Sequence, residues 1–232
     1  MKHFSIDAPK YTVLLAVALL LGACAGNAKP PDWQVEAKGS MDRAVAAYMV
    51  GNSRVEAAEL ARARSQLSRT GRADLLATAE LLHCATRVAS LVFESCSGFE
   101  PLRADATQAQ RAYADYLQGK LPAENVALLP QAQRASAGGD ATALKAVADP
   151  LSQLVAAGVF LQTSRASPPV IAQAIDTASG QGWRRPLLAW LGLQAQRADE
   201  AGDVQEADRL RRRMVIAQGE GLGVHQGEKD KR

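Results

Sequence analysis

The chain contains almost no stretch in which Val, Ile, Thr and Tyr alternate with polar residues, the pattern that a half-buried β-strand requires. Alanine is abundant instead, and aromatic residues make up only 5% of the sequence. This composition suits helices that pack closely through small side chains, and it disfavours a β-sandwich. We therefore predict an all-α fold of about nine helices, arranged as antiparallel helix hairpins.

Glycines, prolines and capping residues mark where the predicted helices begin and end. The spacing of apolar residues predicts helices near 41–50, 53–70, 72–93, 105–118, 123–136, 141–163, 168–179, 186–200 and 203–218. Pro130 and Pro150 fall within two of these ranges, and each would kink the helix that contains it.

The helix predicted at 72–93 is apolar on nearly every side, so it belongs in the interior of the fold. It also carries a strip of four polar residues: Glu80, His83, Arg87 and Ser90. This strip either forms a buried functional seam or lies at a solvated edge, and the general habit of charged side chains favours the solvated edge.

An apolar run at 11–23 follows the positively charged residues Lys2 and Lys10. The run is shorter than the ~20 apolar residues of a membrane-spanning helix, and it fits a cleaved secretory signal. It ends in Leu21-Gly22-Ala23-Cys24, which resembles the lipobox of bacterial lipoproteins. The resemblance implies that the leader 1–23 is removed and that Cys24 is fatty-acylated. The alternative is an ordinary signal peptidase site, with Cys24 a simple thiol.

Ala25 follows the lipobox cysteine. By resemblance to the enteric sorting rule, under which aspartate at this place retains a lipoprotein in the inner membrane, the protein is expected on the periplasmic face of the outer membrane. Residues 24–40 would be the lipidated amino terminus and a flexible tether, 41–218 the periplasmic domain, and 219–232 a disordered, charged tail.

A turn signature occurs three times, at Gly51-Asn52, Gly139-Asp140 and Gly202-Asp203. In each, a glycine ends one helix, an amide or acid begins the next, and an alanine follows where two helices approach closely. The signature is similar to the turns of tetratricopeptide repeats, although the intervals are uneven. This resemblance implies a stacked, solenoid-like array of hairpins.

Once Cys24 is acylated, Cys84 and Cys96 remain as an even pair in an oxidising compartment. They form either a disulfide or two separate thiols. A straight helix would hold their Cα atoms ~18 Å apart, so a disulfide requires the helix to end near Phe93 and the chain to turn back. His83 and the two cysteines lack a fourth ligand, so we expect neither a metal site nor a cofactor.

No catalytic constellation is recognisable in the sequence. Glu94-Ser95 resembles the catalytic pair of lytic transglycosylases, but the glycine-rich motif of that family does not follow it. For partner binding, the candidate residues are two tryptophans that share a helix face and two arginines near the carboxyl end: Trp183, Trp190, Arg212 and Arg213. The alternatives are core packing for the tryptophans and a solvated face for the arginines.

The net charge is only +3 and the basic residues do not cluster on one face, so we expect no nucleic-acid partner. We expect a lipid-anchored protein that interacts with another envelope protein as a scaffold or adaptor. The alternatives are a peptidoglycan-acting enzyme of the lytic-transglycosylase type and a carrier of a small ligand or lipid with an apolar cavity between its helices. The oligomeric state stays open.

Overall fold

The computed structural model describes residues 29–138 and 141–219. Within them the chain forms ten α-helices, two 3-10 helices and no strand, which confirms the predicted all-α class. In chain order, these elements are α2 (Asp32–Met49), α3 (Ser53–Ser68), α4 (Ala73–Ala89), η2 (Glu100–Leu102), α5 (Gln108–Leu117), η3 (Ala123–Leu128), α6 (Gln131–Ala137), α7 (Ala141–Lys145), α8 (Pro150–Gln162), α9 (Pro168–Gly180), α10 (Arg184–Glu200) and α11 (Val204–Gln218).

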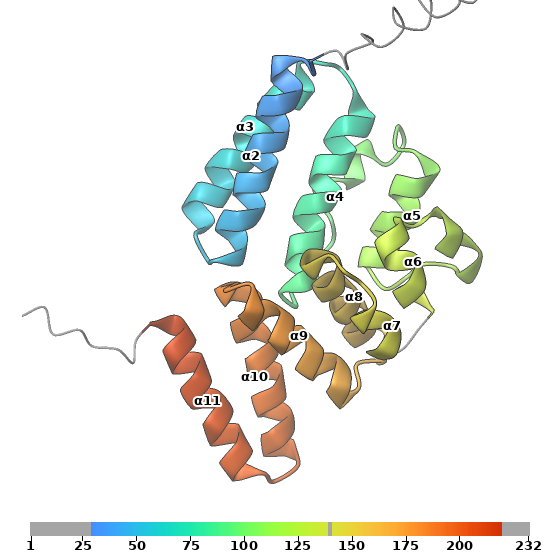
Figure 1. Ribbon diagram of the computed structural model, residues 1–232. Coiled ribbons are helices and arrows are strands. Elements are labelled where there is room, and N and C mark those ends of the chain that lie inside the picture. The colour runs from blue at the N-terminus through green and yellow to red at the C-terminus, as the bar shows by residue number, and fades with distance from the viewer. Residues whose placement is uncertain (1–28, 139–140, 220–232) are drawn as a thin grey trace, which may run out of the picture.

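Two helix hairpins lie at opposite ends of the molecule (Figure 1). The hairpin of α2 and α3 turns at Gly51, whose positive φ of 87° suits glycine, and Asn52 then caps α3 by accepting a hydrogen bond from the Val55 amide. The hairpin of α10 and α11 turns in the same way at Gly202 and Asp203. Helix α4 lies alongside the α2–α3 hairpin, and α8 and α9 lie near the centre of the molecule.

The core has two parts, and α4 belongs to both. Its Ala79 packs with α2 and α3, around Leu60 and Leu67. Its Val88 packs into the larger cluster, which contains Trp190 of α10 and the almost wholly buried helix α8. The prediction that the helix at 72–93, which is α4, lies in the interior is therefore confirmed.

Helices α4 and α8 approach each other most closely at Gly158. A Cβ atom at this position would lie 2.4 Å from the backbone oxygen of Val88, so only glycine fits there. The sequence places this glycine within the apolar run 154–161 of α8.

Several predicted helix boundaries are wrong, and the largest error is at the amino end. Helix α2 begins at Asp32, so residues 32–40 are helical and are not part of a flexible tether. The helix begins this early because Pro31 supplies an extended N-cap and because Trp33, Ala37 and Met41 pack on α3 and α4.

Two further errors occur at prolines. Pro130 separates η3 from α6, and Pro150 begins α8 after the chain has left α7, so the two expected kinks are breaks. At the second break the Asp149 side chain accepts a hydrogen bond from the Ser152 amide, which caps the new helix. These breaks raise the number of helices above the nine expected.

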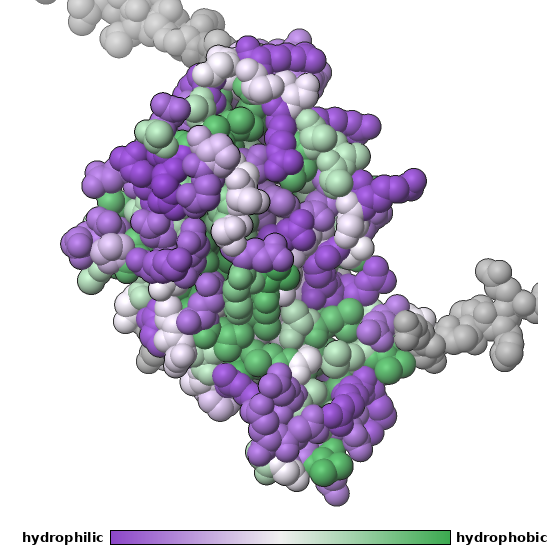
Figure 2. All heavy atoms as spheres, turned by 180° about the vertical axis from the view of Figure 1, so that it is seen from behind, coloured by the Kyte–Doolittle hydropathy of each residue, from purple (hydrophilic) through white to green (hydrophobic). Residues whose placement is uncertain are grey.

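Among the described helices, none combines the length and the apolar character that crossing a bilayer would need. Seen from behind, the surface has a band of apolar side chains across its middle, with hydrophilic side chains above and below (Figure 2).

Candidate functional site: an apolar groove beside α4

Several predicted features lie outside the described residues. They are the leader 1–23, the lipobox cysteine Cys24, the turn at Gly139-Asp140 and the tail beyond Gly219. Gly219 itself has a φ of 80° and ends α11, at the place where the sequence predicted the last helix to stop.

Cys84 and Cys96 are joined by a disulfide, with their Cα atoms 5.5 Å apart. Helix α4 ends at Ala89, earlier than Phe93, and Leu91 then adopts a positive φ of 61° that turns the chain back along the helix. The disulfide therefore holds the loop after α4 against that helix. Both cysteines are taken up by this bond, and the described residues contain no cluster able to hold a metal ion.

Glu94 is exposed on the rim of a pocket of about 180 Å³ beside this loop. A general acid for glycoside hydrolysis works from a sheltered carboxyl group with a second carboxyl across the cleft. The other carboxylate on the pocket, that of Glu80, is already paired with the Arg64 guanidinium at 2.5 and 2.6 Å. This arrangement gives Glu94 no catalytic partner.

The polar strip of α4 forms a buried seam, so the solvated alternative is wrong for most of it. Glu80 is 5% exposed, and Arg87 donates to Glu56 of α3 at 2.8 Å. His83 lies 3.2 Å from the same Glu56 oxygen. The pKa of His83 is lowered, first because the ring is buried and second because the Arg87 cation lies beside it. The ion pairs of the seam join α3 to α4, and its Ser90 hydroxyl is buried.

An apolar hollow lined by several elements lies on the other side of α4. It has a volume of about 520 Å³ and is open to solvent on one side. We call it the α4–α6 groove, and its lining residues are Thr78, Leu81, Leu82, Ala109, Gln110, Tyr113, Leu128, Leu129, Pro130, Gln133, Arg134 and Ser152. They come from α4, α5, the end of η3 and the turn after it, α6 and α8. Helices α4, α5, α6 and α8 lie together in Figure 1.

The α5 wall of the groove is set by a capping box. Thr107 and Gln110 exchange hydrogen bonds of 3.2 and 2.9 Å between side chain and backbone, which begins the helix. The Gln110 amide nitrogen also donates to the Asp74 carbonyl at 2.7 Å and to Thr78 at 2.8 Å. One residue thus begins α5 and fastens it to α4.

The α6 wall is fixed by buried Gln133. Its amide oxygen accepts a hydrogen bond of 2.9 Å from the Tyr116 hydroxyl, and its nitrogen donates to the Ser152 carbonyl at 3.2 Å. Burial raises the pKa of Tyr116 to about 12, so the hydroxyl keeps its proton. The α6 wall is therefore held to both α5 and α8.

Arg134 and Tyr113 of the groove keep unused hydrogen-bonding capacity. Arg134 is exposed and uses only its Nε, which donates to the Leu129 carbonyl at 2.7 Å, so within the described part of the chain its terminal nitrogens are free. The Tyr113 ring stacks on Tyr116, with ring centroids 6.1 Å apart, and its hydroxyl has no partner there. The groove thus combines a mainly apolar lining with the Arg134 cation and several polar side chains, among them the Tyr113 hydroxyl.

The predicted partner-binding tryptophans do not lie on a common surface. Trp190 is fully buried, and its Nε1 donates to the Ala89 carbonyl at 3.1 Å, so it belongs to the core. Trp183 is half-buried at the start of α10 and packs against the same core. Trp190 is not a docking residue, because its face of α10 packs against α4 and not against solvent.

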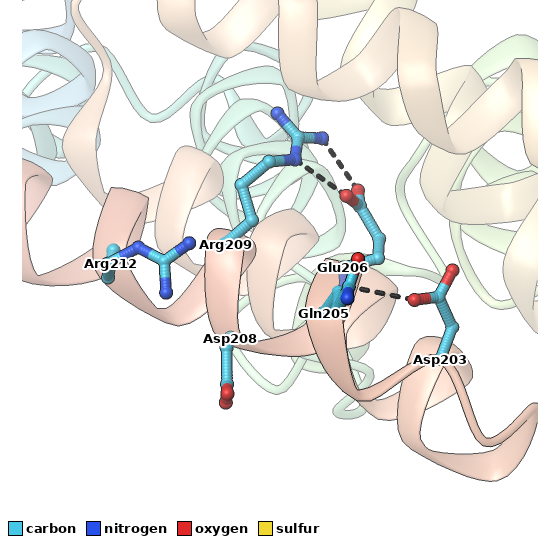
Figure 3. Close-up of a pocket in the computed structure, with 6 residues that line it drawn as sticks. All are labelled: Asp203, Gln205, Glu206, Asp208, Arg209 and Arg212. Carbon is cyan, nitrogen blue, oxygen red and sulfur yellow. Dashed lines mark hydrogen bonds and ion pairs between the residues drawn. The ribbon is translucent and has the colours of Figure 1, made fainter.

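The predicted arginines do lie on the surface, on α11 (Figure 3). Arg209 donates twice to Glu206 at 2.6 Å, whereas Arg212 pairs with no carboxylate among the described residues. Arg213 is half-buried on the same helix and also lacks an ion pair there. A hollow of about 540 Å³ lies over this helix, but all its lining residues come from α11 and its N-cap, so no second element closes it.

Comparison of the chain with protein-family models, with curated proteins and with solved structures finds no significant match.

Proposed function

We propose that this chain is a lipoprotein, anchored through Cys24 to the periplasmic face of the outer membrane, that holds a partner protein of the envelope in the α4–α6 groove. The partner contributes a short segment whose apolar side chains fill the groove. The observation that carries this proposal is the groove itself, an apolar hollow of about 520 Å³ whose walls are fixed by hydrogen bonds before anything binds.

The polar groups of the groove indicate the chemistry of that segment. Arg134 is the one charged residue of the lining, and no acidic residue accompanies it. A segment that presents an acidic side chain next to apolar ones would pair with Arg134 and leave no charge unpaired on either side. The free hydroxyl of Tyr113 supplies a second polar contact.

The openness of the groove favours a protein segment over an enclosed small molecule. Sites for small ligands bury most of the ligand surface, whereas this groove is open to solvent along one side. Apolar grooves between helices commonly receive one face of an amphipathic segment.

We further infer that the hairpins form a degenerate array of the tetratricopeptide type. The support is the repeated turn geometry at Gly51-Asn52 and Gly202-Asp203, where a glycine with positive φ precedes a capping side chain. Such an array leaves surface between its hairpins for a partner.

Photo-crosslinking in intact envelopes tests the proposed docking. A photoreactive amino acid replaces Leu128, which is half-buried on the groove, and in a control it replaces Ala58, which is exposed on α3 away from it. We expect one discrete protein adduct from position 128 and none from position 58. Equal labelling from both positions, or no adduct, would contradict the proposal.

A second candidate function has a specific observation in its favour. The groove volume falls within the ~300–1,000 Å³ of known small-molecule sites, and Arg134 at an apolar hollow would also suit an acyl chain with a carboxylate. The same experiment separates the two, because the adduct would then have the mass of a lipid and not of a protein.

The anchor has an independent test. The Cys24→Ser variant should leave the membrane fraction for the soluble one, because no acyl chain can then be attached. Unchanged fractionation, or a native mass with an unmodified Cys24, would rule the anchor out and leave the groove proposal standing.

A further inference from the structure

Helix α11 has one partnered face and one free face. Its buried residues Ala207 and Leu210 pack on α10, the one element against which it makes extensive contact among those described. Six large apolar side chains are exposed in the described part of the chain, and three of them lie on this single helix: Val204 at 64%, Val215 at 43% and Ile216 at 63%. Val204 lies in the first turn of α11 and the other two lie in its last turn, so the helix exposes an apolar contact at each end.

The side chains of this face follow one another in a defined order. Steps of four residues place Val204, Asp208, Arg212 and Ile216 in one row, which winds about 40° around the helix at each step. The order is therefore apolar, acidic, basic, apolar. Read from the opposite end it is apolar, basic, acidic, apolar, which is the complement of the first in both charge and hydropathy.

Such an order fits a second copy of the same helix running antiparallel. A two-fold axis that crosses the helix near Leu210 places Val204 opposite Ile216 of the second copy and Asp208 opposite its Arg212, and it repeats both pairs by symmetry. Arg212 lacks a carboxylate partner among the described residues. The Asp208 side chain is 54% exposed and accepts from Arg211 of the same helix at 3.1 Å, a surface ion pair that is weak enough to be exchanged. Figure 3 shows Asp208 pointing away from the pair formed by Arg209 and Glu206, and no interaction joins Arg212 to that pair.

We propose that two copies of this chain pair through the free face of α11, in antiparallel orientation. The occupant of the face is thus a second copy, and the complementary order of its residues is what selects it over an unrelated helix. The proposal does not depend on the α4–α6 groove, which other elements form.

The strength of the pairing follows from its size. A helix of 15 residues is ~22 Å long, so two such helices bury less than the ~1,600 Å² of a standard interface. The dimer should therefore be weak, with a dissociation constant in the micromolar range, and sensitive to salt because its ion pairs are near the surface.

Charge exchange tests the proposal on the full chain in detergent solution, by sedimentation equilibrium from about 1 to about 200 μM. Asp208→Arg and Arg212→Asp should each weaken dimerisation at least tenfold, since each places like charges opposite one another twice. The double variant should restore dimerisation to within about threefold, and an equimolar mixture of the two single variants should form heterodimers. Asp176→Arg, an exposed change on α9, is the matched control and should have no effect.

Three results would overturn the proposal. A chain that stays monomeric throughout this range overturns the proposal. So does a dimer that the single variants leave unchanged, or one that the double variant fails to restore. Circular dichroism of each variant confirms that the helices are intact, so that a loss of dimer is not mistaken for a loss of fold.

Discussion

The Arg185 guanidinium lies 4.3 Å from the centre of the Tyr48 ring, although 137 residues separate the two in the chain. The same guanidinium donates to the Tyr48 carbonyl at 2.7 Å and to Ser53 at 2.8 Å. Arg87 of α4 also lies over the Tyr48 ring, at 4.5 Å. Tyr48 thus joins the amino-terminal hairpin to both α4 and α10, and these contacts hold the two ends of the fold together.

Replacing Arg185 by alanine should therefore lower the free energy of unfolding by about 1 to 3 kcal/mol, because a cation–π contact and two charge-assisted hydrogen bonds are lost together. Arg184→Ala is the matched control. Arg184 donates only to the exposed Val50 carbonyl, at 2.8 Å, and its loss should cost under about 1 kcal/mol. Urea denaturation measures both, and an equal effect of the two changes would refute the role assigned to Arg185.

Gly158→Ala tests the close approach of α4 and α8. Alanine normally stabilises a helix by about 1 kcal/mol relative to glycine, but here the new Cβ would meet the Val88 carbonyl and force the helices apart. We expect a loss of about 1 to 3 kcal/mol. Gly180→Ala, at the end of α9 with open space around it, should be neutral or stabilising. The two variants should shift the urea midpoint in opposite directions or at least unequally, and matching shifts would show that the close contact is not rigid.

Reduction of the disulfide should destabilise the protein without unfolding α4. Opening a loop closed over 12 residues costs about 2 to 4 kcal/mol in chain entropy. The double variant Cys84→Ala and Cys96→Ala should show the same loss with or without a reducing agent, whereas the wild type should lose stability only when reduced. If the urea midpoint of the wild type were the same with and without the reducing agent, that result would be inconsistent with this disulfide.

The seam between α3 and α4 predicts a pH dependence of stability. Because the folded pKa of His83 is lowered, the unfolded chain takes up a proton more readily, and stability falls as pH drops below the ordinary histidine value of about 6.5. The groups facing the ring are Glu56 of α3 with Arg87 and Glu80 of α4. His83→Gln should flatten the stability profile between about pH 7.5 and 5.5, above the range where carboxylates titrate. If stability changed with pH equally in the variant and the wild type, groups other than His83 would be responsible for the effect.

Much of the fold could be predicted from the sequence because the residues that end and cap its helices are easy to recognise. Gly51-Asn52 and Gly202-Asp203 end and begin helices where predicted, and the apolar pattern of α4 correctly placed that helix inside. Local sequence patterns failed to predict a helix boundary where contacts with other helices determine it. The amino end of α2 is helical because Trp33 and Ala37 reach α3 and α4, which no local pattern among its charged neighbours indicates.

The candidate groove could not be predicted from the sequence. Its lining combines side chains such as Leu82, Tyr113 and Leu128, which come from three separate elements and meet only after Pro130 breaks the predicted helix. The apolar doublets at 81–82 and 128–129 were the available signal, but doublets of this kind also fill cores. The buried seam was missed for a related reason, since the partners of Glu80 and Arg87 lie on α3, one helix away.

The docking of a partner segment in the α4–α6 groove is the central claim, and blocking the groove tests it most directly. Ala109→Trp places a large side chain on an exposed position of the lining, and Ala58→Trp makes the same change on α3, outside the groove. The photo-crosslink from position 128 is then measured in both backgrounds at equal thermal stability. We predict that the adduct is lost in Ala109→Trp and kept in Ala58→Trp; adducts of equal yield in the two variants would contradict the claim.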